Sequence, residues 1–450
     1  MKTKVAIIVP IYNGAKYLPP FMESVLAQNY SEFDMICVDD ASDDATYEIL
    51  LEYAKRDERI HIYQNDMRKG AACSRNFGLK MANAEYVVFL DADDLIERDF
   101  LLQLLCAVKE DKADIAFCEQ DRFEGEKYDN IRKPLNERLI HKVYSKKFRL
   151  WDLDINDAIS IPGNPIIYII RKAFIEKYHI EFQSLTSSND TFFVEMIKIL
   201  AGGIIHVRDA RALIHLRQHN QISRISYSRD PMNAYKAVLA VKHKLEELNL
   251  WESAREYYIC RVQRILVTAV KDTRAEDNKV QFLKFLQREG LKKLGFNEEI
   301  LYCDYLTKDK RFICDLFLHG NYQDIEAIEP FDVAIRANTE RIKELFVGWR
   351  GKRIVFWGIG YRWERLYQWC SDEMQFEYLL ADTYKAGQLW NNTEVMNCKM
   401  AARQAEITVV MNDLFLDDVL QQIKFCNMSL PVFSLEKYIM MEMQMEKCWN

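Results

Sequence analysis

The chain has 450 residues, too many for one ordinary hydrophobic core, so its length predicts two or three domains. Its net charge of −7 argues against a nucleic acid as partner. No stretch approaches the roughly 20 apolar residues of a membrane span, and the apolar run at 5–11 is too short, and interrupted by Pro10, for a signal peptide. The eleven cysteines are scattered without a CxxC pair, which is typical of a reduced, cytoplasmic protein.

Strands and helices alternate through the first half of the chain. We expect strands at 5–10, 33–38, 60–63 and 86–90, separated by helices at 15–29, 46–56 and 70–83. A helix at 100–110, strands at 114–119 and 166–170, and a helix ending at 200 follow. This alternation predicts a parallel, doubly wound α/β sheet, in which ligands bind beyond the carboxyl ends of the strands.

Polar clusters follow three of the predicted strands. Tyr12 and Asn13 follow the first, Asp39 and Asp40 end the second, and three carboxylates within residues 91–94 follow the fourth. These clusters are expected to line one crevice. Carboxylates this close repel unless a cation or hydrogen-bond donors offset their charge, so residues 91–94 suit Mg²⁺ or Mn²⁺. The alternative is a solvated acidic turn that caps the next helix.

Four motifs, VAIIVPIYNG, ICVDDASDD, RNFGL and YVVFLDADD, stand in an order and spacing that resemble glycosyltransferase family 2. Members of that family are inverting nucleotide-sugar transferases with the GT-A fold, and the resemblance covers the first half of the chain. It implies metal-dependent transfer of a sugar from a nucleotide-diphosphate donor, with UDP expected, to a hydroxyl of a glycan or lipid-linked saccharide. Synthesis of a bacterial cell-surface polysaccharide, such as a capsule, is the implied setting.

The resemblance also implies how the nucleotide is bound. The backbone near Pro10 contacts it, and the ring of Tyr12 stacks on the base. Asp40 accepts a hydrogen bond from the base, with Asp39 beside it. Arg75 lies near the diphosphate or the base. A lone arginine on a helix is otherwise a surface charge, and the pair of aspartates is otherwise a charged helix start.

The metal and the proton transfer are assigned by the same resemblance. Asp93 is the first metal ligand, and Asp91 meets the ribose or the metal, which is Mn²⁺ or Mg²⁺. Asp190 is the general base that deprotonates the acceptor hydroxyl. Asn189 stands where the family has a glutamate, which implies a changed hydrogen-bond environment, and helix capping is the alternative role for this pair. Arg217 would neutralise the leaving phosphate.

The second half of the chain changes character twice. Residues 160–164 resemble the acceptor-side loop of the family. From 231 onward, helices at 232–248, 252–271, 278–288 and 325–345 predict a helical connector. The expected domains are therefore a transferase domain at 1–228, a connector at 229–350 and a small domain at 351–450.

The small domain has the outline of a dinucleotide-binding βαβ unit. Strands at 353–357, 378–381 and 407–411 surround a Gly358-Ile359-Gly360 turn and a helix at 363–370. The fingerprint is incomplete, because Trp363 stands where the third glycine belongs. We expect a Rossmann-like α/β domain, which either binds a cofactor or serves as a docking or oligomerisation module.

Two other functions remain open. A nucleotidyltransferase also uses carboxylates and Mg²⁺ on a similar sheet, but the chain has no Gly-rich phosphate loop after its first strand. A catalytically weak nucleotide-sugar-binding or regulatory protein, with the last domain as its output module, is consistent with Asn189. Peripheral association with the inner face of the membrane and a homo-oligomer are left open as well.

Overall fold

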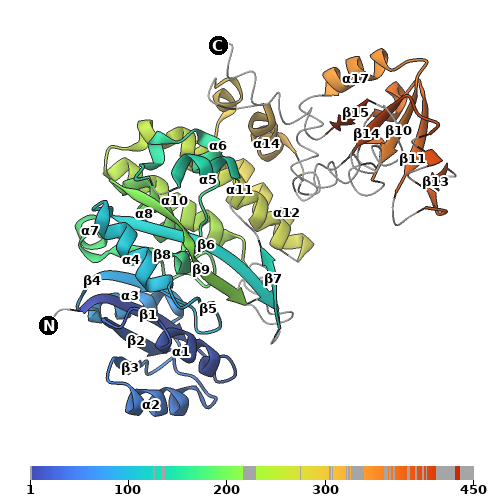
Figure 1. Ribbon diagram of the computed structural model, residues 1–450. Coiled ribbons are helices and arrows are strands. Elements are labelled where there is room, and N and C mark those ends of the chain that lie inside the picture. Colours follow the sequence, from blue (N-terminus) through green and yellow to red (C-terminus); the bar gives the residue numbers. More distant parts are fainter. Residues whose placement is uncertain are drawn as a thin grey trace. The chain divides into compact units, whose positions relative to one another are not determined.

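The computed structural model describes residues 3–124, 127–132, 137–144, 146–215, 230–273, 275–303, 306, 308–320, 322, 325, 339–358, 363, 366–367, 370–382, 386–390, 393–397, 400–401, 403–411 and 431–435 (Figure 1). Contacts divide the chain into two compact units, Met1–Phe296 and Asn297–Asn450. The helices at 232–294 thus share a unit with the predicted transferase domain. The finer division at 228 and 350 stays a prediction.

The first unit alternates strands and helices in the predicted order. Its strands are β1 (Thr3–Ile11), β2 (Phe33–Asp39), β3 (Ile60–Gln64), β4 (Ala84–Phe89), β5 (Leu95–Ile96), β6 (Ile115–Glu124), β7 (Lys127–Arg132), β8 (Tyr168–Arg171) and β9 (Ile204–His215). Its α-helices are α1 (Leu18–Leu26), α2 (Thr46–Arg56), α3 (Ala71–Met81), α4 (Phe100–Glu110), α5 (Glu137–Val143), α6 (Ile155–Ala158), α7 (Lys172–Tyr178), α8 (Thr191–Leu200), α10 (Met232–Glu247), α11 (Trp251–Asp272), α12 (Glu276–Phe285) and α13 (Leu291–Leu294). Short 3-10 turns are η1 (Leu150–Asp152) and η2 (Pro165–Ile167), and η3 (Leu286–Gly290) is a π-helical turn.

One sheet runs through the described part of this unit, in the order β3-β2-β1-β4-β8-β6-β9-β5, with β7 beside β6 (Figure 1). The four predicted strands β1 to β4 are parallel, as expected. β8 is antiparallel to both β4 and β6, whereas β6 and β9 are parallel. The parallel arrangement predicted from the first four strands is thus confirmed, whereas β5, β7 and β8 run antiparallel to their neighbours. The sequence did not indicate these reversals, because an apolar run carries no information on the direction of its neighbours.

The direction of β8 matters for the crevice. Because β8 runs against β4, its amino end lies at the edge where β4 ends. The segment before β8 is a 3-10 turn and not the start of the predicted strand at 166–170. Asn164 begins this turn by accepting a hydrogen bond from the N–H of Ile166, and Pro165 occupies the first position. The predicted acceptor-side loop at 160–164 is thereby brought toward the carboxyl ends of the parallel strands.

Apolar strands are buried on both faces where helices cover them. Residues 5–9 of β1 and 86–89 of β4 have at most 5% of their surface exposed. Helix α3 packs close to β1 at Gly78, where an added Cβ would lie 2.5 Å from Cγ2 of Ile8. The glycine of the RNFGL motif therefore permits this close approach of helix and sheet.

The second unit contains a separate sheet. Its strands are β10 (Arg353–Trp357), β11 (Glu377–Ala381), β12 (Leu389–Trp390), β13 (Thr393–Met396), β14 (Ile407–Val410) and β15 (Val432–Ser434). Its helical segments include η4 (Glu298–Tyr302), α14 (Lys308–His319), α17 (Thr339–Gly348) and η5 (Ser371–Glu373). The strand order is β12-β13-β11-β10-β14-β15, parallel except for the β12–β13 pair.

Two predicted helices differ from what is described. The predicted helix at 325–345 is described as helical at 325 and, within α17, at 339–345, and the residues between lie outside the described part. The predicted helix at 278–288 continues past its expected end through η3 into α13. Among the described residues, no helix combines the length and the apolar character that a membrane span requires.

Replacement of Gly78 by alanine should destabilise the first unit. Ile8 is fully buried, and its β-branched side chain has little freedom to move away from the new methyl group. We expect a loss of about 1–3 kcal/mol, larger than the gain in helix propensity. Denaturant unfolding of Gly78→Ala checks this, with Lys80→Ala on the exposed face of α3 as control. An alanine variant as stable as the wild type would contradict the packing described here.

Candidate functional site

A cavity of about 480 Å³ lies in the first unit, at the carboxyl ends of β1, β2 and β4. The segments that line it come from distant parts of the sequence. Its lining residues are Pro10, Ile11, Tyr12, Gly14, Asp40, Arg68, Gly70, Ala71, Arg75, Asp91, Ala92, Asp93, Asp94, Gly163, Asn164, Thr186, Ser187, Ser188, Asn189, Asp190 and Ile214. The three polar clusters predicted to share a crevice thus contribute to one cavity.

Tyr12 stands in the turn after β1, where it contacts a residue that the sequence did not single out. The guanidinium of Arg68 lies 4.1 Å from the centre of the Tyr12 ring. Arg68 is exposed and belongs to the loop before α3. The sequence could have indicated Arg68, because it is a basic residue two positions before Gly70, at which α3 begins. One face of the predicted base-stacking ring therefore carries a cation.

Asp40 lines the cavity and is almost fully buried, with 3% of its surface exposed. Its Oδ1 accepts hydrogen bonds from Asn65 Nδ2 at 2.7 Å and from the Lys69 N–H at 2.8 Å. Its Oδ2 accepts one from the N–H of Gly70 at 2.7 Å. Gly70 has φ +88°, a conformation that favours glycine. Asp40 therefore fixes the loop that leads into α3.

Asp39, its neighbour, is not among the residues that line the cavity. Its side chain is fully buried. Its Oδ1 accepts from Ser42, and its Oδ2 accepts from Gln64 Nε2 at 2.9 Å. Alternation along a strand explains the difference, because successive side chains point to opposite faces. Asp39 holds the turn after β2 and the end of β3.

Arg75 joins the sheet to the start of α8. Its Nη2 donates to Asp91 Oδ1 at 2.6 Å, and its Nη1 donates to Asn189 Oδ1 at 3.3 Å. Its guanidinium carbon lies 5.2 Å from the centre of the Phe182 ring. The residue is 6% exposed, and its Nε has no hydrogen-bond partner among the described residues. It is therefore a buried cation at the cavity wall and not a surface charge.

Asp190 stands at the N-cap position of α8, yet its side chain makes no capping hydrogen bond. The carboxylate thus lacks the usual capping hydrogen bond, although the backbone N–H groups of Asp190 and Thr191 interact with it and partly lower its pKa. Burial raises the pKa of Asp190 above its ordinary value. The Arg75 guanidinium opposes this shift, and the Asp91 carboxylate adds to it. A carboxylate with a raised pKa that lines a cavity is suited to accept a proton.

Asp91 and Asp93 are the cavity residues that could hold a divalent cation. Carboxylate oxygens match Mg²⁺ and Mn²⁺, which commonly take one or two protein carboxylates and complete their shell with water and substrate phosphates. No cluster of three or more His, Cys, Asp or Glu side chains arranged for a metal occurs within the described ranges. The carboxylates of Asp91 and Asp93 therefore fit the donor set that such an ion takes from a protein, and Asp94 lines the cavity beside them.

A second wall of the cavity comes from Gly163 and Asn164 before β8 and from residues 186–189 before α8. The loop predicted for the acceptor side contributes the first two. Thr186 and Ser187 were not predicted, since loop residues far from a strand end carry no periodic signal. Arg217, predicted to meet the leaving phosphate, lies outside the described residues.

The second unit holds Trp363 in its core. The indole is fully buried, and its ring centre lies 4.7 Å from that of Phe356 and 5.5 Å from those of Tyr378 and Trp390. The strand order β13-β11-β10-β14-β15 is the doubly wound order in which ligands bind at the carboxyl ends of the strands. Ile359 and Gly360 of the predicted glycine turn lie outside the described part.

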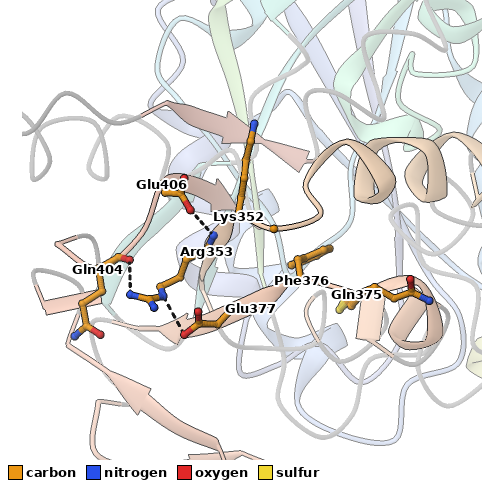
Figure 2. A pocket seen from close by; sticks show the side chains of 9 residues that line it. Lys352, Arg353, Gln375, Phe376, Glu377, Gln404 and Glu406 are labelled. Carbon is orange, nitrogen blue, oxygen red and sulfur yellow. Dashed lines mark hydrogen bonds and ion pairs between the residues drawn. The ribbon is translucent and has the colours of Figure 1, made fainter.

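The second unit also has a shallow pocket of about 760 Å³ at the opposite, amino end of its strands. Figure 2 shows Arg353 at its centre, where the N–H donates to Glu406 Oε2 at 2.8 Å and Nε lies 2.9 Å from Glu377 Oε1. These charged groups pair with one another. The pairing of Arg353 with Glu377 and Glu406 gives these groups a structural role at the start of the strands.

Comparisons with known proteins agree on the first unit. The profile of glycosyl transferase family 2 matches residues 6–171. Glycosyltransferase GlyG of Streptococcus pneumoniae is 25% identical over 245 residues, which are 52% of this chain and 79% of GlyG. The putative teichuronic acid biosynthesis glycosyltransferase TuaG of Bacillus subtilis is 41% identical over 113 residues, which are 24% of this chain and 45% of TuaG.

The structure of S. aureus TarS 1-349 in complex with UDP-GlcNAc is similar with a TM-score of 0.56 and 19% identity, over 75% of this chain and 92% of that chain. At this identity the similarity establishes the fold, which is GT-A-like. The match to TuaG spans less than half of that protein, whereas the family profile lies within the unit that contains the cavity. Residues 6–171 therefore form a glycosyl transferase family 2 domain, and this part of the chain is similar to proteins named as glycosyltransferases.

Proposed function

We propose that the chain transfers a sugar from a UDP-sugar to a hydroxyl group of a glycan or lipid-linked saccharide, with inversion and with Mn²⁺ or Mg²⁺. A role in the synthesis of a bacterial cell-surface polysaccharide accords with relatives such as TuaG, which is named for teichuronic acid biosynthesis. The observation that carries the proposal is the meeting of Asp91, Asp93 and Asp190 in one cavity, with Arg75 bonded to the first.

The arrangement supplies the parts that an inverting transfer needs. Asp190 removes the proton of the acceptor hydroxyl as its oxygen attacks the anomeric carbon, and the nucleotide diphosphate departs from the opposite face. Because the pKa of Asp190 is raised, its carboxylate is a stronger base than an exposed aspartate. Asp93 and Asp91 would hold the divalent ion, which offsets the charge of the leaving diphosphate when bound.

Asp40 and Tyr12 support a uracil nucleotide. Asp40 Oδ2 accepts one hydrogen bond from Gly70, so it keeps a lone pair that can accept from the imide N–H of uracil. A base that presents an acceptor at that point would place it against this carboxylate oxygen, which is repulsive and disfavours that base. The Tyr12 ring offers a stacking face, and Arg68 adds a positive charge next to it.

The rival proposal, a regulatory protein that only senses a nucleotide-sugar, rested on Asn189 in place of the usual glutamate. Asn189 accepts a hydrogen bond from Arg75 and donates one to the Leu185 carbonyl at 3.4 Å. Its amide therefore keeps the contacts that join Arg75 to the start of α8, without a further negative charge beside Asp190. This favours an active enzyme over a degenerate site.

Metal-dependent binding of UDP should require Asp93. We expect UDP with Mn²⁺ to raise the Tm of the wild type, and EDTA to abolish most of the rise, because the diphosphate is held through the ion. Asp93→Ala should lose the Mn²⁺-dependent part. A thermal-shift titration checks this, with Asp43→Ala, an exposed carboxylate outside the cavity lining, as control. An unchanged Mn²⁺ effect in Asp93→Ala would refute the assigned ligand.

Asp190→Asn should abolish transfer while leaving the protein at least as stable. Loss of a general base costs about 10²–10⁴-fold in kcat. A raised pKa in the folded state means that the ionised carboxylate destabilises the fold at neutral pH, so the neutral amide removes this cost. Activity assays, UDP binding and Tm measured together check the prediction. Wild-type turnover, or a clear drop in Tm at pH 7, would contradict it.

The same pKa shift predicts the pH dependence of the wild type. Asp190 must be ionised to act as base, so kcat should fall as the pH drops through its pKa. Because burial raises that pKa, the acid limb should lie above the value of about 3.9 that is ordinary for aspartate. Hydrolysis of UDP-GlcNAc measured between pH 4 and 9, with stability followed in parallel, provides the profile. An acid limb at or below pH 4 would oppose the assignment.

A further inference from the structure

The helices at 232–272, which were predicted as a connector, contact the segments that form the cavity wall on the side that faces away from the cavity. Glu195 of α8 lies five residues after Asp190 and is 3% exposed. Its Oε1 accepts from Arg261 Nε of α11 and from Lys198 Nζ, both at 2.8 Å. Its Oε2 accepts from Tyr257 Oη of α11 at 2.6 Å. The helix that begins at the proposed base is thus held by α11 through one buried carboxylate.

This carboxylate is ionised under ordinary conditions. Burial alone would raise the pKa of Glu195, but Arg261 and Lys198 outweigh burial and lower it to about 2. Loss of a cationic partner would leave a buried charge uncompensated, which is strongly destabilising. A substitution that keeps a positive charge at position 261 therefore retains the partner that Glu195 needs for stability. Its effect on activity then reports the loss of the other guanidinium contacts.

The same arginine reaches the other segment of the wall. Arg261 Nη1 lies 3.5 Å from the carbonyl oxygen of Ile159, to which Arg264 Nη1 also donates at 2.9 Å. Gly163, which lines the cavity, approaches so closely that an added Cβ would lie 2.7 Å from Arg261 Nη2. The loop before β8 therefore rests on the guanidinium that binds α8.

Helix α10 contacts a second segment of the cavity wall in a similar way. Asn233 is 5% exposed, and its Nδ2 donates to Thr186 Oγ1 at 2.8 Å and to Ser187 Oγ at 3.1 Å. Both partners line the cavity just before Asp190. Side chains of α10 and α11 thus contact two segments of the cavity wall, the loop before β8 and residues 186–187 before α8.

We propose that Arg261 is a positioning residue, which holds the Ile159–Gly163 backbone and the Asp190 end of α8 in register for catalysis. The inference rests on the proposed function, because it assumes that Asp190 is the base. Arg261 does not line the cavity and touches neither substrate nor metal. Its planar guanidinium binds Glu195 on one side and the loop on the other, which the single ammonium of lysine cannot reproduce.

Arg261→Lys is the test, with Arg255→Lys on the same helix as the matched control. A lysine retains the charge for Glu195 and loses the two-sided contact. We expect kcat for UDP-GlcNAc hydrolysis to fall by about tenfold or more, because small displacements of a base are costly. KM and the affinity for UDP should stay within about twofold of the wild type. If UDP-GlcNAc is not hydrolysed, the UDP-hexose that the wild type hydrolyses fastest replaces it.

A second variant approaches the same contact from the loop. Gly163→Ala places a methyl group against the guanidinium, so it should lower kcat in the same way. The double variant should lose less than the product of the two single effects, because both disturb one contact. Amide hydrogen exchange should quicken at 159–164 and 186–190 in Arg261→Lys, and not in β1 or β4.

The possible results separate the two proposals. Unchanged kcat in Arg261→Lys, or equal losses of kcat and UDP affinity, would overturn the positioning role while leaving the transferase proposal intact. Strictly multiplicative effects in the double variant would also overturn it. A wild type that neither binds UDP nor hydrolyses any UDP-sugar would overturn the proposed function, and the positioning role with it.

Discussion

The cavity depends on a buried cation among carboxylates. Asp91, Asp93 and Asp190 all line it, and Arg75 bonds to the first and to Asn189. A guanidinium this deep costs several kcal/mol of desolvation unless its hydrogen bonds are made. Asp91 and Asn189 accept hydrogen bonds from its two Nη atoms, and the Phe182 ring lies beside its guanidinium. With the neutral Asn189 in place of an acid, the pKa of Asp190 is set mainly by burial and by the balance of Arg75 against Asp91.

Strand direction decides which loops of the sheet reach the cavity. Parallel strands β1, β2 and β4 place Tyr12, Asp40 and Asp91 at a common edge. The antiparallel strand β8 adds the loop that precedes it to the same edge, which brings Gly163 into the cavity lining. The side of the cavity proposed to bind the nucleotide is thus made by strand ends. The opposite side is made by the loops before β8 and α8. Loops need support from outside the sheet, which α10 and α11 give through Asn233 and Arg261.

The second unit shows how much a partial fingerprint can indicate. Alternating strands and helices correctly indicated a doubly wound sheet, and its strand order is the one that such sheets use. The position expected for a third glycine holds Trp363, whose indole fills the core beside Phe356 and Trp390. Large aromatic burial stabilises a small domain and leaves less room there for a dinucleotide. A docking role for this unit stays a prediction.

The sequence by itself determined the elements and the acidic residues at strand ends, because hydrophobic periodicity and local charge are written in neighbouring residues. It placed α2 and α4 at their observed bounds and named Tyr12, Asp40, Asp91, Asp93 and Asp190, all of which line the cavity. Only the tertiary structure decided that Asp39 points away, that β8 is reversed and that Arg68 lies on Tyr12. It alone joined Arg261 to Glu195 and Ile159, since contacts across 66 and 102 residues leave no periodic trace in the chain.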